Sequence, residues 1–196
     1  MTFQFLPTLV FVLVMLCWFA FAGIFLLRKK PPSPPDQKRA PGSLFGVALQ
    51  GLSYGIVWGV HRPMFSPFVG SSEAIEVVAG VLAVGSAVGS VWLIMKALKT
   101  LGKEWSLTAR LVEGHQLATD GPYAYVRHPI YTGMLGMLVA TGLAVSHWAA
   151  LLAALVIFFV GTIIRVRSEE KLLRGKFGEK FEAYARRVPA ILPGLF

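Results

Sequence analysis

The residues best suited to chemistry lie in the second half of the chain, in two short polar clusters. The first runs from Gly121 to Tyr131 with the sequence GPYAYVRHPIY, which combines three tyrosines with an arginine and a histidine. Gly-Pro favours a turn, and Pro129 suits the first position of a helix. Free backbone N–H groups at a helix start favour an anionic or electron-rich ligand group. The same residues also fit an aromatic and basic belt that anchors a membrane span.

The second cluster, RVRSEE at positions 165–170, follows the last long apolar run. Adjacent carboxylates at a membrane surface suit a cationic ligand. A structural role fits too, in which Ser168 caps a helix and the two acids in its first turn complement the helix dipole. Because both clusters flank the same apolar hairpin on the same side, we favour a shared functional site.

Beyond this cluster, apolar residues recur at a spacing of three to four positions. They are Leu172, Leu173, Phe177, Phe181 and Tyr184. This spacing predicts an amphipathic helix with Lys and Arg on its other face. Such a helix either rests on the membrane or forms a lid that shields a site from water.

The composition indicates a membrane protein. Hydrophobic residues make up 55% of the 196 residues and charged residues only 15%, against about a quarter in ordinary globular chains. The net charge of +9 does not indicate nucleic-acid binding, because the basic residues lie between long apolar runs. Cys17 is the only cysteine, so no disulfide forms within the chain. No Cys/His zinc spacing exists either, and we predict no metal site.

The apolar runs predict the fold class, because a bilayer core of roughly 30 Å needs about 20 apolar residues in a helix. Runs cover about 3–27, 43–60 and 74–98, with a Pro-rich linker at 28–42. The run at 130–164 is too long for one span and is interrupted near Ser146, which predicts a helical hairpin over 129–165. We therefore expect an all-α integral membrane protein with about five transmembrane helices and a C-terminal amphipathic helix. The first run ends in Arg28-Lys29-Lys30 and is interpreted as a retained span, not a signal peptide.

The basic residues predict the orientation. If the linker lies inside, five crossings leave the N-terminus outside and the C-terminus in the cytoplasm. On this arrangement 18 of the 19 Lys and Arg residues lie inside, and only Arg62 lies outside, in agreement with the positive-inside rule. The polar segments 100–128 and 166–196 then both face the cytoplasm beside the hairpin, so we expect the chemistry there.

Several short elements in the second half have a specific order and spacing. They are Leu101-Gly102 with Trp105-Ser106, His115-x-Leu117, Gly121-x-Tyr123, Arg127-His128-Pro129-x-Tyr131, Arg165, Glu169-Glu170, Phe177-Gly178, Tyr184 and Pro189. In these elements the chain resembles the integral-membrane methyltransferases related to isoprenylcysteine carboxyl methyltransferase and, more distantly, phosphatidylethanolamine N-methyltransferase. The resemblance implies that residues 100–196 form the methyltransferase core and residues 1–99 contribute three spans and the linker.

The resemblance implies S-adenosylmethionine as methyl donor, bound in a cytoplasmic pocket that the C-terminal segment closes. It implies cofactor contacts from His115, Gln116, Leu117, Ala118, Tyr123, His128, Pro129, Ile130, Tyr131 and Glu169, with Glu170 as a second candidate. Their chemistry agrees, because carboxylates pair with the donor's amino group and tyrosines cover adenine or the sulfonium by cation–π contact. Arg165 is implied to face the acceptor as the catalytic residue.

The acceptor stays open between a carboxylate, an amine and a thiol. A carboxylate needs no base and fits a bidentate pair with Arg165, whereas an amine or thiol must lose a proton, and Arg165 would then bind a phosphate. Arg165 also fits a positive-inside anchor. The chain departs from its relatives in Lys171, which ends the acidic run, and in lacking the extra spans of larger eukaryotic members. We expect a lipid-like or amphiphilic acceptor, and the sequence does not predict the oligomeric state.

Two other functions remain as alternatives. Membrane reductases of the sterol type share a similar C-terminal motif region, but they use NADPH and are much longer. A non-enzymatic membrane scaffold or carrier would tolerate the replacement of Glu169 or His128.

Overall fold

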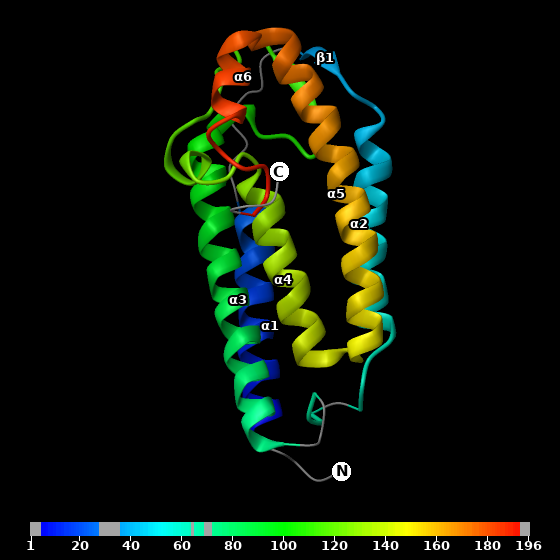
Figure 1. Cartoon of the computed structure of the whole chain (residues 1–196). Helices are drawn as coiled ribbons and strands as arrows, with labels where there is room; N and C mark the ends of the chain where they lie inside the picture. The colour runs from blue at the N-terminus through cyan, green and yellow to red at the C-terminus, as the bar shows by residue number, and fades with distance from the viewer. Residues whose placement is uncertain (1–4, 28–35, 64, 69–71, 193–196) are drawn as a thin grey trace. The chain divides into compact units, whose positions relative to one another are not determined.

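The computed structural model describes residues 5–27, 36–63, 65–68 and 72–192. Most of the predicted linker at 28–42 and the first two residues of the predicted span at 3–27 lie outside the described residues. The main helices and strands, in chain order (Figure 1), are α1 (Phe5–Leu26), β1 (Asp36–Arg39), α2 (Ser43–Gly59), α3 (Glu73–Leu101), β2 (Arg110–Val112), α4 (Pro129–Val145), α5 (Trp148–Phe177) and α6 (Glu179–Ala185).

The helices have the length and composition of membrane spans. By these two criteria α1, α3 and α5, with 22, 29 and 30 residues, can cross a bilayer. Helix α4 is also apolar but has 17 residues, as does α2; a helix of this length extends about 26 Å, close to the thickness of a bilayer core. The predicted class, an all-α integral membrane protein, is confirmed.

The chain divides into two compact units. Unit 1 comprises Met1–Arg28, Gly51–Trp92 and Gly133–Phe158. Its core contains Val10 and Val14 of α1, Ala83 and Ala87 of α3, and Met137 and Ala140 of α4. Half of these residues are alanines, whose small side chains let the three helices pack closely. A few polar contacts join the same helices, among them Trp18 Nε1 donating to Thr141 Oγ1 at 3.0 Å.

Arg62, the basic residue predicted to lie outside, has a structural role in unit 1. Only 7% of it is exposed. Its guanidinium donates to the carbonyl oxygens of Ser146 at 2.6 Å and Ala144 at 3.0 Å. These carbonyls belong to the end of α4 and the turn that follows, where helix carbonyls lack partners of their own.

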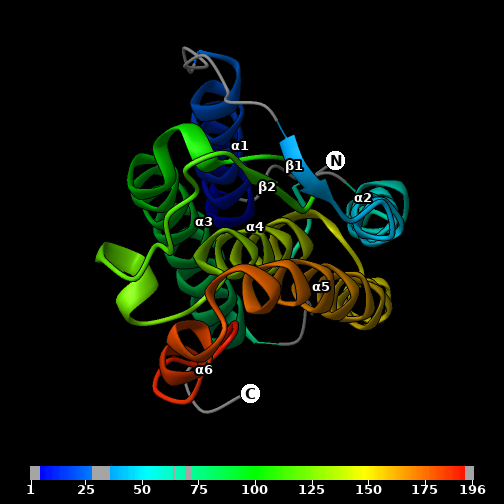
Figure 2. The same ribbon diagram turned by 90° about the horizontal axis from the view of Figure 1, so that it is seen from above.

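Unit 2 comprises Lys29–Gln50, Leu93–Thr132 and Phe159–Phe196. Strands β1 and β2 pair antiparallel (Figure 2). Next to this pair, Ala40 N donates to Ala109 O at 3.0 Å, and Ala109 N donates to Ser43 Oγ at 3.1 Å. The segment before α2 therefore fixes the loop that follows α3.

Helix α5 continues without a break from Trp148 to Phe177. The interpretation of Ser168 as a helix cap is therefore wrong: the residue lies inside α5, where its hydroxyl donates to Ile164 O at 2.8 Å. The chain turns at Gly178, whose φ of +51° is a conformation that glycine adopts most readily. The predicted amphipathic segment accordingly consists of the last turns of α5 followed by the short helix α6.

Candidate active site

Unit 2 contains a cavity of about 900 Å³, counted with its open mouth, which we call the unit 2 pocket. Its wall combines apolar and aromatic side chains with carboxylates, imidazoles and guanidinium groups. The lining residues are Leu101, Glu104, Trp105, Ser106, Thr108, Ala109, Arg110, Leu111, His115, Gln116, Leu117, Ala118, Tyr123, Arg127, His128, Ile130, Tyr131, Arg165, Glu169, Leu172, Leu173, Phe181 and Tyr184. A largely apolar cavity with a few convergent polar groups is typical of a small-molecule site.

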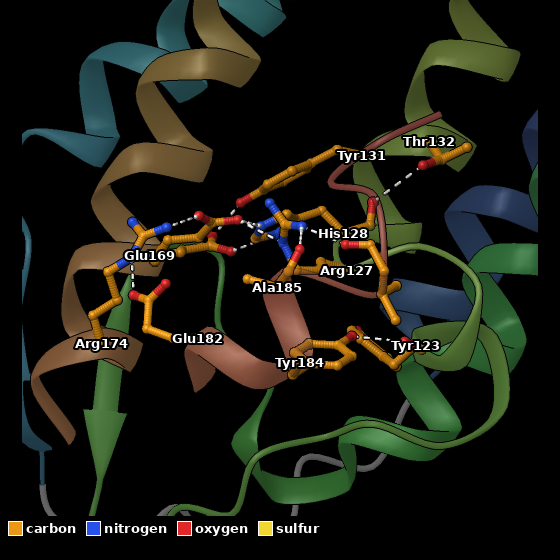
Figure 3. Close-up of polar contacts among 12 residues, drawn as sticks. Tyr123, Arg127, His128, Tyr131, Thr132, Glu169, Arg174, Glu182, Tyr184 and Ala185 are labelled. Carbon is orange, nitrogen blue, oxygen red and sulfur yellow. Dashed lines mark hydrogen bonds and ion pairs between the residues drawn. The ribbon is translucent and has the colours of Figure 1, made fainter. Parts of the chain in front are cut away.

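Glu169 is a carboxylate in the pocket wall whose position is fixed by the first polar cluster. Its Oε2 lies 3.3 Å from His128 Nδ1, and Tyr131 Oη donates a short hydrogen bond to Oε1 (Figure 3). The rings of His128 and Tyr131 stack at 5.5 Å between centroids. About a quarter of the Glu169 side chain, 26%, remains exposed, so the carboxylate is available to a ligand in the pocket.

Glu170 has a different role, although it is the next residue. It does not line the pocket and is 5% exposed. Its carboxylate pairs with Arg127 Nε at 2.9 Å, with Arg174 Nη2 at 3.0 Å and with His128 Nε2 at 3.3 Å. Glu170 therefore joins the segment before α4 to α5.

His128 lies between the two carboxylates. Burial alone would lower the pKa of its imidazole, but the hydrogen bonds and charges of Glu169 and Glu170 outweigh burial and raise it. Both ring nitrogens face carboxylate oxygens, so His128 bridges the two side chains and orients Glu169.

The C-terminal strap, residues 185–191, covers the start of α4. Arg127 N donates to Pro189 O at 2.8 Å, His128 N donates to Ala190 O at 2.9 Å, and Thr132 Oγ1 donates to Ile191 O at 2.6 Å. The prediction of free N–H groups at this helix start is therefore wrong for residues 127 and 128. Carbonyl groups of the strap accept hydrogen bonds from these two N–H groups. The first polar cluster therefore contributes side chains, rather than these backbone N–H groups, to the pocket.

Helix α6 covers the pocket. Phe181 is 1% exposed and Tyr184 is 5% exposed, and both line the wall. Tyr184 Oη donates to Tyr123 O at 2.6 Å, and burial raises the pKa of its phenol to about 12. Burial also raises the pKa of Tyr123, so both phenols remain neutral. Of the two alternatives for this segment, the structure favours the lid.

The loop after α3 forms another part of the pocket wall, and the residues that it contacts belong to unit 2. Gln116 N donates to Glu104 Oε1 at 2.8 Å. The His115 ring lies 6.1 Å from that of Phe177, and burial lowers the pKa of the imidazole, so His115 is neutral near pH 7. Its Nδ1 is buried and has no hydrogen-bond partner among the described residues, which leaves one polar atom of the wall available to a ligand.

Arg165 reaches the pocket from α5. It is 4% exposed, Nη2 donates to Leu107 O at 2.6 Å, and the guanidinium carbon lies 4.5 Å from the centre of the Tyr131 ring. Nε is buried and has no hydrogen-bond partner in the part of the chain that the structure describes. A guanidinium with an unused donor at a pocket wall can bind an anionic or electron-rich group.

Most of the predicted site residues meet at this pocket. The wall includes His115, Gln116, Leu117, Ala118, Tyr123, His128, Ile130, Tyr131, Arg165 and Glu169, whereas Pro129 and Glu170 do not line it. Tyr125 of the first cluster is 76% exposed and also lies away from the wall. Glu104, Thr108 and Arg110 also line the pocket but were not predicted. The available signal was the presence of an acidic and a basic residue in the short loop after a membrane span.

Comparison with known proteins identifies the family. The profile described as phospholipid methyltransferase matches residues 75–180, more than half of the chain. The chain belongs to the phospholipid methyltransferase family. In this chain the matched segment runs from α3 into α6 and includes His128, Arg165 and Glu169.

Individual relatives are similar over part of the chain. The protein-S-isoprenylcysteine O-methyltransferase of Schizosaccharomyces pombe is 30% identical over 104 residues, 52% of this chain and 44% of that protein. The cobalt-zinc-cadmium resistance protein CzcN of Cupriavidus metallidurans is 38% identical over 107 residues, 50% of this chain and 46% of that protein. The methanethiol S-methyltransferase of Pseudomonas deceptionensis is 38% identical over 74 residues, 37% of this chain and 27% of that protein. The chain thus spans less than half the length of each of these three relatives.

Proposed function

We propose that this protein transfers a methyl group from S-adenosylmethionine to a membrane-embedded or amphiphilic acceptor at the cytoplasmic face of a membrane. The observation that carries the proposal is the Glu169 carboxylate, which His128 and Tyr131 hold at the wall of the unit 2 pocket. It lies in the segment that matches the phospholipid methyltransferase family. When bound, the donor supplies a methyl group that its sulfonium already activates, and no metal is needed.

The pocket residues fit such a donor chemically. Glu169 suits its ammonium group, and the buried Nδ1 of His115 offers one hydrogen-bonding atom without a partner among the described residues. The rings of Tyr123 and Phe181 line the same wall and suit adenine or, by cation–π contact, the sulfonium. Gln116, Leu117 and Ala118 complete this part of the wall as further candidate contacts.

Arg165 is the candidate catalytic residue at the acceptor end. Its guanidinium binds and orients an anionic or electron-rich group, and its Nε has no hydrogen-bond partner among the described residues. A carboxylate acceptor held in this way would need no base. The names of two relatives specify methylation at oxygen and at sulfur, so similarity to them supports methyl transfer more strongly than it supports any one acceptor.

Exclusion of water and alignment of the two reactants are the main tasks of such a site. Phe181 and Tyr184 of α6 cover the pocket, and the ion pairs and the strap around Arg127 hold the start of α4 in place. Alignment of two reactants can by itself lower a barrier by roughly 7–11 kcal/mol. The distribution of Lys and Arg in the sequence supports the cytoplasmic side, because most of these residues flank this site.

Two alternatives predict different binding. A sterol-type reductase would bind NADPH and not the methyl donor, and a scaffold would bind neither. Family membership supports the methyltransferase over both.

The test is calorimetric titration of the detergent-purified protein with S-adenosylhomocysteine, beside Glu169→Ala and His128→Ala. We expect saturable binding by the parent protein that both variants lose. Glu113→Ala, which removes an exposed carboxylate outside the pocket wall, is the matched control and should bind like the parent. A folded parent that binds NADPH but not S-adenosylhomocysteine would refute the proposal.

A further inference from the structure

Gln50 is a buried polar residue near the middle of α2, outside the segment that matches the family. It is 1% exposed. Its Oε1 accepts a hydrogen bond from Arg165 Nη1 at 2.6 Å, and its Nε2 donates to Thr162 Oγ1 at 2.7 Å. A guanidinium can only donate, so the amide oxygen must face Arg165 and the amide orientation is fixed.

The second support of Arg165 is also an uncharged oxygen, the carbonyl of Leu107. Within the described residues, Arg165 forms no ion pair at 4 Å or less. The guanidinium is therefore restrained by two neutral acceptors and rests near the Tyr131 ring. Neutral acceptors hold the group without forming an ion pair with it, whereas a carboxylate in place of Gln50 would do so. The Glu169 carboxylate also interacts electrostatically with Arg165, but not as an ion pair within 4 Å.

Two glycines bring α2 close enough for this contact. A Cβ atom on Gly46 would lie 2.5 Å from Arg165 Cγ and 2.6 Å from Gly161 O, and a Cβ on Gly161 would lie 2.8 Å from Gly46 O. Both views show α2 and α5 running side by side (Figures 1 and 2). The position of the guanidinium thus depends on backbone contact between the two helices.

We infer that Gln50 is a positioning residue: it holds the Arg165 guanidinium at the pocket wall and, being uncharged, leaves its positive charge available to the acceptor. This inference rests on the proposed methyl transfer. Gln50 could otherwise serve only to tie α2 to α5, since buried polar residues commonly join helices in membranes. The two roles differ in one respect, because a tie between helices does not require a neutral side chain.

The first test observes the guanidinium directly and needs no acceptor. The arginines of the detergent-solubilised protein are labelled with ¹⁵N, and Arg165→Lys assigns the Arg165 signals. A restrained guanidinium gives separate Nη signals, and one that rotates freely gives averaged signals. We expect separate signals in the parent and in Gln50→Glu, and averaged signals in Gln50→Met. Leu52→Met, on an exposed position of the same helix, is the control and should resemble the parent. Separate signals in a folded Gln50→Met protein would overturn the inference.

The second test separates positioning from a tie between helices. Transfer of tritiated methyl groups is measured with N-acetyl-S-farnesylcysteine, phosphatidylethanolamine vesicles and methanethiol as acceptor probes. With any probe that the parent methylates, we expect kcat/KM to fall about tenfold or more in Gln50→Met and in Gln50→Glu, with S-adenosylhomocysteine binding unchanged. Parent-like transfer by Gln50→Glu would overturn the role of the neutral side chain. If the parent itself fails to bind S-adenosylhomocysteine, the proposed function fails, and the NMR spectra still decide whether Gln50 holds Arg165.

Discussion

Glu169 and Glu170 are adjacent in sequence, and we predict that replacing each by glutamine has a different effect, one on ligand binding and the other on stability. Glu169 lines the unit 2 pocket, and 26% of its side chain is exposed. Glu170 lies outside the wall and pairs with Arg127 and with His128. Glu169→Gln should therefore impair donor binding, and Glu170→Gln should lower the free energy of unfolding.

Glu170→Gln should lose stability because it leaves the buried Arg127 guanidinium without its carboxylate partner. The Arg127 side chain is 9% exposed, and removal of one member of a buried ion pair costs about 3–5 kcal/mol. We take the lower end, about 3 kcal/mol, because Arg127 also donates to the carbonyl oxygens of Ala185 and Val188. The bond to Arg174 adds little, since that side chain is 47% exposed. For a chain of this size about 3 kcal/mol corresponds to a fall of about 6–12 °C in Tm.

The assay is thermal unfolding in detergent, with and without S-adenosylhomocysteine at about 100 times its Kd. A ligand at that concentration stabilises the folded state by about 2.7 kcal/mol, so we expect it to raise the Tm of the parent by about 5–11 °C. Glu170→Gln should begin from the lower Tm and keep this rise, whereas Glu169→Gln should lose most of the rise. Glu179→Gln, at an exposed position of α6, is the control and should behave like the parent.

Two results would refute this reasoning. One is a Glu169→Gln protein whose Tm still rises with ligand as in the parent. The other is a Glu170→Gln protein with parental Tm and no response to ligand, which would make Glu170 the carboxylate that binds the donor.

Two further predictions concern packing and pH. Gly46→Ala should lower the free energy of unfolding by about 1–3 kcal/mol, because its Cβ would lie 2.6 Å from Gly161 O. Gly51→Ala is the control and should be neutral or slightly stabilising, because a Cβ there would meet no atom within 4 Å. Equal Tm values for the two variants would contradict this prediction. Glu169 and Glu170 raise the pKa of His128, so its stabilising charge is complete below about pH 6.5 and is lost as pH rises through the folded pKa. The parent's Tm should therefore fall from about pH 6.5 upward, and His128→Asn should flatten the profile; an equally steep profile in that variant would count against His128.

The fold class was predictable from composition, because the long apolar runs and the sparse charges leave few alternatives to membrane helices. Ten of the residues that line the pocket were also predicted as site residues, since the family motifs are short and their spacing is specific. The assignment of Glu170 to the pocket did not hold, for a geometric reason. Successive residues of a helix point about 100° apart, and here Glu169 faces the cavity while Glu170 faces Arg127 and Arg174. The sequence offered no means to choose between Glu169 and Glu170.

The strap was not predicted either, although Pro189 belongs to the motifs noted in the sequence. A helix start has unpaired N–H groups in any sequence, and whether a ligand or the chain's own carbonyl groups take them depends on tertiary structure. Here Pro189 O and Ala190 O take the donors at residues 127 and 128. This arrangement leaves the side chains of His128 and Tyr131, rather than the backbone, to orient the pocket carboxylate.

Gln50 shows why the matched segment alone does not describe this site. Arg165 lies within residues 75–180, but the amide that restrains it lies on α2, 115 positions earlier in the chain. The signal in the sequence was a glutamine inside an otherwise apolar run, a position where a polar side chain needs a buried partner. Because Gly46 and Gly161 bring the two helices into backbone contact, small changes in α2 should move the guanidinium while Glu169 and its partners stay in place. The first half of the chain can thereby alter the pocket wall at Arg165 independently of the wall at Glu169.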